Sequence, residues 1–240
     1  MLKNQAGFRK NHSTLDNIFL LQVLAEYCKH KRSKLFCAFI DFQKAFDSVW
    51  RTGLWSKIVK YNINGKLFSV IKNLYKETKS CLLLNNDKSD FFACSRGVRQ
   101  GENLSPILFS LYLNDLEHYL LSRNNCNISI EDMDLDIYIQ IIVLLYADDT
   151  VLFARSEQDL LTLLDSFIEY CETWKLDVNV DKTKILVFGD RLGRSRHVPV
   201  RNNNFEVVDS FKFLGIMFSK KQKFCKGKIS HSRTSQKSII

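Results

Sequence analysis

Hydrophobic residues recur at helical spacing over residues 14–30 and predict an amphipathic helix there. The next apolar run, "SKLFCAFIDF" at 33–42, is short and rich in aromatic residues, which favours a buried strand that ends at Asp41. The apolar positions of the first helix are expected to be Leu15, Ile18, Phe19, Val23 and Leu24.

The middle of the chain shows helical patterns on either side of a hairpin pattern. Residues 44–73 are predicted to be helical with a break at "YNINGK", and "SCLLLNNDKSDFFACSRG" (80–97) predicts a β-hairpin with an Asn-Asn-Asp turn. Gly101 and Pro106 then mark the start of another helix. Its apolar face is expected to run through Ile107, Leu108, Leu111 and Leu116.

Residues 124–136 are acidic and polar, which predicts a loop or an insertion ahead of the strand that leads into Tyr146. "SEQDLLTLLDSFIEYCETWKL" (156–176) has a Ser cap, acidic first-turn residues and an apolar repeat, and predicts a helix. Residues 183–189 and 211–218 are predicted to be short strands. The basic, weakly periodic segment 220–240 is predicted to be a disordered tail.

This order mixes helices and hairpins without a steady alternation of strand and helix. It predicts an α+β domain in which helices pack on one face of an antiparallel sheet. With 240 residues, 45% of them hydrophobic, the chain can bury one sizeable core or two small ones.

The net charge of +9 favours an anionic partner, either a nucleic acid or a membrane surface. The longest apolar stretch, 141–147, is far shorter than the ~20 residues that span a bilayer, and residues 1–10 lack the apolar core of a signal peptide. The chain is therefore expected to be soluble and intracellular, in either nucleus or cytoplasm. The seven cysteines lack the spacing of a zinc site and are expected to be reduced thiols.

Two neighbouring carboxylates, Asp148 and Asp149, lie between two apolar runs in "LLYADDTVLFA" (144–154). A solvated Asp-Asp turn is a common hairpin tip. Alternatively, a divalent cation neutralises the repulsion between the two charges. Asp41, at the end of its own strand, would be a third carboxylate and would allow a two-metal site.

Five segments resemble, in the right order, the reverse transcriptase motifs lettered A to E. They are "AFIDFQKAFDSVW" (38–50), "RGVRQGENLSPILFSLYLND" (96–115), "LLYADDTVLFA" (144–154), "WKLDVNVDKTKILVFG" (174–189) and "FKFLGIMF" (211–218). "QAGFRKNHSTLDNI" (5–18) is similar to the finger segment of non-LTR (LINE-type) retroelement and group II intron enzymes. The resemblance implies a right-hand polymerase fold.

The resemblance implies that Asp41, Asp148 and Asp149 hold two Mg²⁺ ions, for which Mn²⁺ can substitute, and that the backbone carbonyl of Phe42 adds a ligand. Phe46 matches the aromatic residue that excludes a 2′-hydroxyl and so selects deoxynucleotides. On spacing alone, Phe46 would be a core residue.

Gln100 and Gly101 match positions that line the nucleotide and template pocket, although the site is also a plain helix N-terminus. Family members commonly carry a different residue at the position of Glu102. The negative charge of Glu102 would repel a triphosphate unless its side chain points away. Asp47 is left out of the triad because it falls in the helical stretch, where it could cap or pair.

Lys182 matches the lysine that protonates the pyrophosphate leaving group, and otherwise would be one of many solvated lysines. Arg9 and Lys10 lie where finger residues contact the triphosphate or the template. Residues 211–218 resemble the primer grip, a tight hairpin that can equally be core.

The resemblance implies partial fingers at 1–34, a palm at 35–219 and no thumb. The expected function is that of an RNA-directed DNA polymerase with RNA template, DNA primer and deoxynucleoside triphosphates as partners, no membrane partner and an undetermined oligomeric state. The alternative is a catalytically inactive nucleic-acid-binding remnant. An unrelated Mg²⁺ phosphotransferase would be expected to carry a GxxxxGK[ST] loop, which the sequence lacks.

Overall fold

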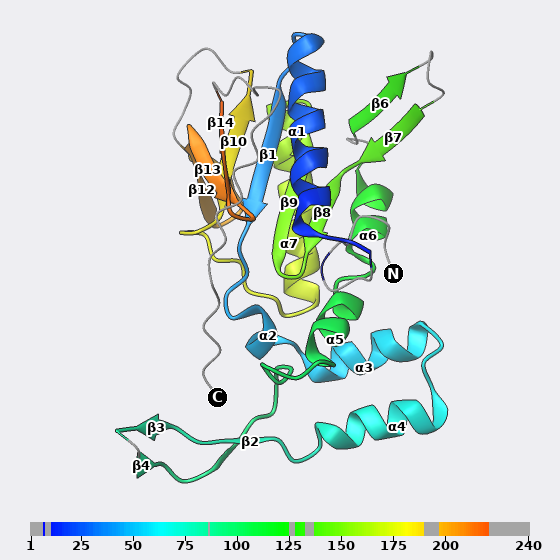
Figure 1. Ribbon diagram of the computed structural model, residues 1–240, viewed down its shortest axis with the longest axis vertical. Coiled ribbons are helices and arrows are strands. Elements are labelled where there is room, and N and C mark those ends of the chain that lie inside the picture. Colours follow the sequence, from blue (N-terminus) through cyan, green and yellow to red (C-terminus); the bar gives the residue numbers. More distant parts are fainter. Residues whose placement is uncertain are drawn as a thin grey trace.

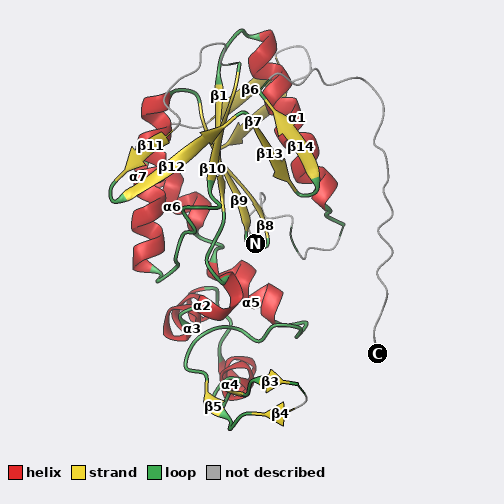
Figure 2. Ribbon diagram, turned by 90° about the vertical axis from the view of Figure 1, so that its left-hand side faces the viewer, coloured by secondary structure: helices red, strands yellow, loops and turns green. Residues whose placement is uncertain are grey.

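A six-stranded sheet forms the centre of the computed structural model, which describes residues 7, 11–85, 87–124, 128–132, 137–189 and 197–220. The strand order is β11-β12-β10-β1-β9-β8 (Figures 1 and 2). The bounds are β1 Leu35–Ile40, β8 Val143–Tyr146, β9 Asp149–Ala154, β10 Lys184–Phe188, β11 His197–Val200 and β12 Asn203–Val208.

The predicted strand at 33–42 is confirmed as β1, the inner strand between β9 and β10. It pairs antiparallel with both neighbours, whereas β10 and β12 are parallel, so the sheet is mixed and not wholly antiparallel. All six residues of β1 are buried. Since Ile40 lies opposite Thr150, Asp41 leaves the sheet next to the β8–β9 turn.

The α+β class is confirmed, but helices cover both faces of the sheet and not one. Side chains alternate along β1. Leu35, Cys37 and Phe39 pack with α1 (Thr14–His30), and the residues between them pack with α7 (Glu157–Thr173). An inner strand that is buried on both sides is apolar throughout. It lacks the alternation of apolar and polar residues that would show whether helices cover one face of the sheet or both.

Both long helices begin where the sequence predicts. Ser13 caps α1 in a capping box with Asp16, and the Ser156 hydroxyl accepts from the backbone of Asp159 at the start of α7. The predicted apolar face of α1 is wrong in part, because Leu15 and Phe19 are exposed. The residues that α1 buries are Asn17, Leu21, Leu24, Ala25 and Cys28.

The helix predicted after Pro106 is divided into α5 (Ser105–Tyr112) and α6 (Leu116–Arg123). Leu108 and Leu116 are buried as expected, whereas Ile107 is 41% exposed. Residues 44–73 form α2 (Ala45–Ser48), α3 (Arg51–Lys60) and α4, which spans Gly65–Leu74.

Helix α4 and the hairpin after it extend away from the sheet as a separate lobe (Figures 1 and 2). The predicted hairpin is confirmed as two short ladders, with β2 (Lys79–Ser80) paired to β5 (Phe92–Ala93) and β3 (Leu83–Leu84) paired to β4 (Asp87–Lys88). Arg51 fixes its base by donating hydrogen bonds to the carbonyls of Tyr75, Cys94, Arg96 and Gly97.

The loop expected at 124–136 is wrong in part, because β6 (Ile128–Asp132) pairs antiparallel with β7 (Ile137–Ile141). The segment 211–218 belongs to one hairpin, β13 (Ser210–Phe213) with β14 (Ile216–Ser219). The predicted tail beyond residue 220 lies outside the described residues.

Five cysteines of the described chain are free thiols, as expected: Cys28, Cys37, Cys81, Cys94 and Cys171. Among the described helices, none combines the length and the apolar character needed to cross a membrane. The division into fingers at 1–34 and palm at 35–219 stays a prediction.

Candidate active site

Two of the three candidate carboxylates lie at the tip of the β8–β9 hairpin. Tyr146 pairs with Asp149, so Ala147 and Asp148 form a two-residue turn. Ala147 has a φ of +57° while Asp148 does not have a positive φ, which is the pattern of a type II′ turn. This position favours glycine, and an alanine there costs about 1 kcal/mol. Packing holds the strained residue in place, since Ala147 is buried.

The backbone of Asp41 is fixed by a segment about 140 residues further along the chain. Its amide donates to the Thr183 hydroxyl at 3.1 Å, and its carbonyl accepts from the Asn179 amide at 2.8 Å. Lys182 lies between these two partners in sequence, and its ammonium nitrogen is 4.0 Å from the Asp41 carboxylate. The Lys182 side chain is 71% exposed, so this ion pair is weak.

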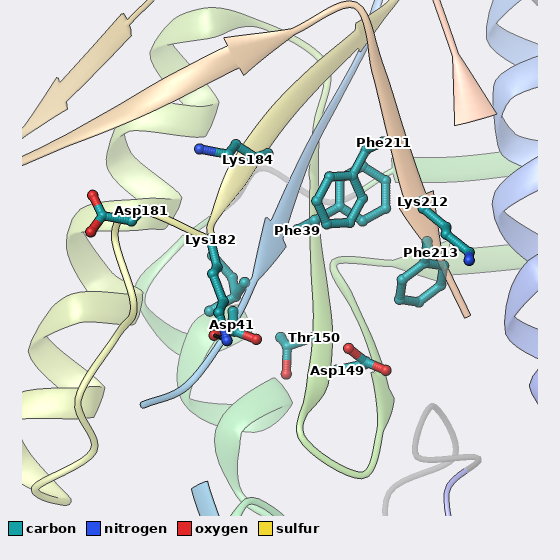
Figure 3. A pocket seen from close by; sticks show the side chains of 11 residues that line it. Phe39, Asp41, Asp149, Thr150, Asp181, Lys182, Lys184, Phe211, Lys212 and Phe213 are labelled. Atoms are coloured by element: carbon teal, nitrogen blue, oxygen red, sulfur yellow. Dashed lines mark ion pairs between the residues drawn. The ribbon is translucent and has the colours of Figure 1, made fainter. Parts of the chain in front are cut away.

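Alternation along the strands places Asp41 and Asp149 on the same face of the sheet. Phe39 and Val151, two residues from each carboxylate, both belong to the cluster that includes α1. One cavity of about 450 Å³ is lined by both carboxylates and by Lys182 (Figure 3). The remaining lining residues are Phe39, Ile40, Thr150, Asp181, Lys184, Phe211, Lys212 and Phe213.

The surroundings of Asp149 disfavour the charged form of its carboxyl group. The pKa of Asp149 is raised to about 6, mainly because the carboxyl is partly removed from water and further because Asp148 and Asp41 carry like charges nearby. Near neutral pH this site therefore carries negative charge whose repulsion a cation would relieve.

Among the described residues, no three acidic, histidine or cysteine side chains lie close enough together to hold a metal ion. Asp41 and Asp149 nevertheless line one cavity, and Mg²⁺ takes only one or two carboxylates and completes its shell with water and phosphate oxygens. The buried Thr150 hydroxyl, beside them, makes no hydrogen bond with a described residue. The donor set fits a divalent cation held by two carboxylates, whereas Asp148 does not line the cavity.

A second cavity of about 700 Å³ brings Phe46 together with Gln100 and Gly101, which lie more than 50 positions further along the chain. Phe46 is half-buried and stacks on Phe109 with a ring-centroid distance of 4.9 Å. It is therefore anchored in the core and also lines an open cavity. Gly101 has a φ of +86°, which explains the glycine there.

The charge of Glu102 is neutralised locally. Its carboxylate accepts from the Arg99 guanidinium at 2.7 Å, and both residues line the second cavity. The repulsion expected from Glu102 is therefore reduced. Asp47, which the sequence analysis left out of the triad, accepts hydrogen bonds from the Gln100 amide on both carboxylate oxygens.

The other candidates are placed less directly. The Phe42 side chain is buried and packs near Phe167, so only its backbone is left for a ligand role. Arg9 and Lys10 lie outside the described residues. The sequence analysis did not identify four residues of this site: the anchors Thr183 and Asn179 and the cavity residues Thr150 and Lys212. All four lie inside the quoted motifs, among them Thr183 in "DKTK" and Lys212 in "FKF".

The family model for reverse transcriptase (RNA-dependent DNA polymerase) matches residues 1–218. The chain is 27% identical over 228 residues to an RNA-directed DNA polymerase from the mobile element jockey of Drosophila melanogaster, covering 92% of this chain and 24% of that protein. It is 31% identical over 196 residues to a probable RNA-directed DNA polymerase from transposon BS of the same organism, covering 75% and 19%. The chain thus spans about a quarter or less of these relatives.

Among solved structures, the apo telomerase of Candida tropicalis truncated from its C-terminal domain matches with a TM-score of 0.56 and 15% identity, covering 82% of this chain and 39% of that one. The right-hand polymerase fold predicted for this chain is confirmed by that likeness. The predicted relationship to non-LTR, LINE-type elements is confirmed by the mobile-element relatives. Members of the family generally use divalent metal ions. The chain belongs to the reverse transcriptase (RNA-dependent DNA polymerase) family.

Proposed function

We propose that this chain is the RNA-directed DNA polymerase domain of a LINE-type element and adds deoxynucleotides to a DNA primer on an RNA template. The observation that supports this most directly is the shared cavity of Asp41 and Asp149, with Lys182 at its edge. Two carboxylates from different strands, one with a raised pKa, form a site suited to a charged reaction centre.

Asp41 and Asp149, with Asp148 beside them, would hold Mg²⁺, for which Mn²⁺ could substitute. Two such ions, when bound, supply charge neutralisation around the in-line displacement at the α-phosphorus. The protein's own contribution is to fix the carboxylates. Thr183 and Asn179 hold the Asp41 backbone, and the strained type II′ turn holds Asp148 and Asp149 at the tip.

Phe46 would select deoxynucleotides, because its ring lines the second cavity and would clash with a 2′-hydroxyl there. Gln100 and Gly101 line the same cavity and would contact the incoming nucleotide. The Phe42 carbonyl and Arg9 keep the roles that the family resemblance assigns them, as a metal ligand and a triphosphate contact.

Lys182 would donate a proton to the pyrophosphate leaving group. It can reach the site because its ammonium already lies 4.0 Å from Asp41. Phe211, Lys212 and Phe213 line the opposite wall and would brace the primer end. The domain would act inside the cell, in nucleus or cytoplasm, with no membrane partner.

Primer extension on an RNA template with deoxynucleotides and Mg²⁺ tests this function. We expect extended product from the parent chain and none from Asp41→Asn, which keeps the side-chain shape and removes the charge. Extension at the parent rate by Asp41→Asn would refute the assignment.

One observation favours the alternative of an inactive nucleic-acid-binding remnant. Asp148, the third carboxylate, does not line the cavity that Asp41 and Asp149 share. The remnant would bind primer-template without extending it.

A further inference from the structure

A run of basic residues begins in the last turn of α1 and continues to the start of β1, at the end of the sheet away from the catalytic carboxylates. We call residues 29–34 the basic turn; its cations are Lys29, His30, Lys31, Arg32 and Lys34. Residues 29–33 are exposed. The turn has a defined backbone, because the Arg32 amide donates to the Lys29 carbonyl at 3.1 Å and the Ser33 amide donates to the Cys28 carbonyl at 2.9 Å.

The charge of the basic turn exceeds what the end of a helix requires. The partial charge at a helix C-terminus is about half a negative unit, whereas this turn carries four formal positive charges with its histidine neutral, out of a net +9. No Asp or Glu occurs between residues 27 and 40. Neither Lys29 nor Arg32 forms an ion pair with another described residue.

The basic turn ends helix α1, which packs on the same face of the sheet as the cavity of Asp41 and Asp149. Helix α1 packs on the sheet face that also carries Phe39, Phe213 and Phe218, next to the β13–β14 hairpin (Figure 1). Strand β1 begins just after the turn and ends just before Asp41. At ~3.3 Å per residue, these six residues separate the turn from the carboxylates by roughly 20 Å.

We propose that the basic turn is a nucleic-acid contact in addition to the active site. It binds the phosphate backbone of the template-primer duplex about six base pairs behind the site of synthesis. The position follows from the distance, because ~20 Å corresponds to about six base-pair steps of 3.4 Å. This inference rests on the proposed polymerase function. Its ligand is a duplex phosphate backbone of any sequence, because flexible exposed lysines contact phosphates without reading bases.

The test measures binding as a function of duplex length. Hairpin primer-templates with 4 or 12 paired positions and the same single-stranded overhang are titrated by fluorescence anisotropy at several salt concentrations. The variant is Lys29→Gln, Lys31→Gln, Arg32→Asn; asparagine is chosen because Arg32 has a φ of +52°, which asparagine tolerates. The matched control, Lys60→Gln, Lys66→Gln, Lys76→Gln, removes three exposed charges near α4.

We expect the parent to bind the 12-pair duplex more tightly than the 4-pair duplex. The basic-turn variant should lose about tenfold in affinity for the long duplex only, and its salt dependence, as the slope of log K against log salt, should fall by about 2 to 3. The control should change binding to both duplexes by the same factor, if at all. Matching thermal midpoints show that the variants are folded.

Retention of the full length dependence by the basic-turn variant would overturn this inference and leave the polymerase proposal standing. An equal loss on both duplexes would also overturn it, because the turn would then be a general source of charge. A parent chain that binds neither duplex, at any salt concentration, would overturn both proposals.

Discussion

The side-chain amide of Gln100 donates to both carboxylate oxygens of Asp47, each at 3.2 Å. Asp47 directly follows Phe46, and the Phe46 carbonyl in turn accepts from the Val98 amide at 2.8 Å. A Cβ on Gly97 would lie 2.7 Å from the Asp47 carbonyl oxygen, so only glycine permits this approach. These contacts therefore hold Gln100 together with Phe46, the residue that would exclude ribonucleotides.

We predict that Asp47→Ala raises the KM for deoxynucleotides about fivefold with little change in kcat. An exposed hydrogen bond to a charged group contributes on the order of 1 kcal/mol, and here it orients a binding residue. Asp47→Asn keeps an acceptor for the amide and should recover most of the loss. Steady-state kinetics on a homopolymeric template measure both values, and an unchanged KM in Asp47→Ala would show that Gln100 needs no such support.

Phe46→Ala is predicted to reduce the preference for deoxynucleotides over ribonucleotides by at least tenfold, because the steric barrier to a 2′-hydroxyl is removed. It should also lower the free energy of unfolding by about 2 kcal/mol through loss of the stack on Phe109. Competing incorporation of the two nucleotide types measures the preference.

Phe109→Leu provides the control for the steric prediction. It removes the stacking partner from the buried side and leaves the Phe46 ring on the cavity side. We expect a loss of stability with the nucleotide preference largely kept. A drop in preference equal to that of Phe46→Ala would show that core packing, and not the ring itself, determines selection.

Asp149→Asn is predicted to stabilise the metal-free fold near neutral pH. The folded-state pKa of about 6 lies above the ordinary value of 3.8, so ionisation of Asp149 disfavours the folded state. Parent stability should fall as the pH rises from about 4 to about 6, and the advantage of the variant should grow over the same window. Well below pH 4, Asp149 of the parent is protonated in both the folded and the unfolded state. The stability difference between the variant and the parent should then vanish.

Urea unfolding at pH 4, 5, 6 and 7, with and without Mg²⁺, measures this dependence. Mg²⁺ should stabilise the parent more than the variant, which is a readout of metal binding independent of catalysis. A variant less stable than the metal-free parent at pH 7 would contradict the electrostatic account of the site.

Asp115→Asn is predicted to destabilise the fold by about 3 kcal/mol, because it leaves a buried ammonium without its counter-ion. Lys57 is 1% exposed, lies 2.6 Å from Asp115 and contacts the rings of Tyr112, Tyr170 and Trp174. Burial lowers its pKa to about 8, against the opposing effect of Asp115. Lys57→Met should cost less than Asp115→Asn in urea unfolding at pH 7; the reverse order would contradict this account.

Local patterns in the sequence were sufficient to predict much of this fold. The capped helices, the strand that ends just before Asp41 and the hairpin at 80–97 all follow from residue spacing and turn residues. The hairpin at 128–141 was also visible as alternating isoleucines, in "ISIED" and "IYIQI", but the acidic residues between them favoured a loop. The exposed face of α1 could not be read locally, since it depends on what the tertiary fold covers.

The parts of the site that depend on distant contacts could not be predicted. Thr183 and Asn179 anchor Asp41 across about 140 residues, and Gln100 meets Asp47 across 53 positions. Most residues that the motif resemblance singled out line one of the two cavities, but Asp148 and Phe42 do not. The resemblance says nothing of the hydrogen bonds that hold these residues in place. Lys57 looked like one more helical lysine, and only the tertiary structure reveals its buried ion pair.

The most direct test of the account compares the parent with the Asp148→Asn, Asp149→Asn double variant in RNA-templated primer extension with Mg²⁺. Binding of the same primer-template is measured in parallel, because the near-isosteric variant should keep it. We predict extension by the parent alone, with binding retained by both. Equal extension by the double variant, or binding without extension by both proteins, would contradict the claim that the hairpin carboxylates form a catalytic site.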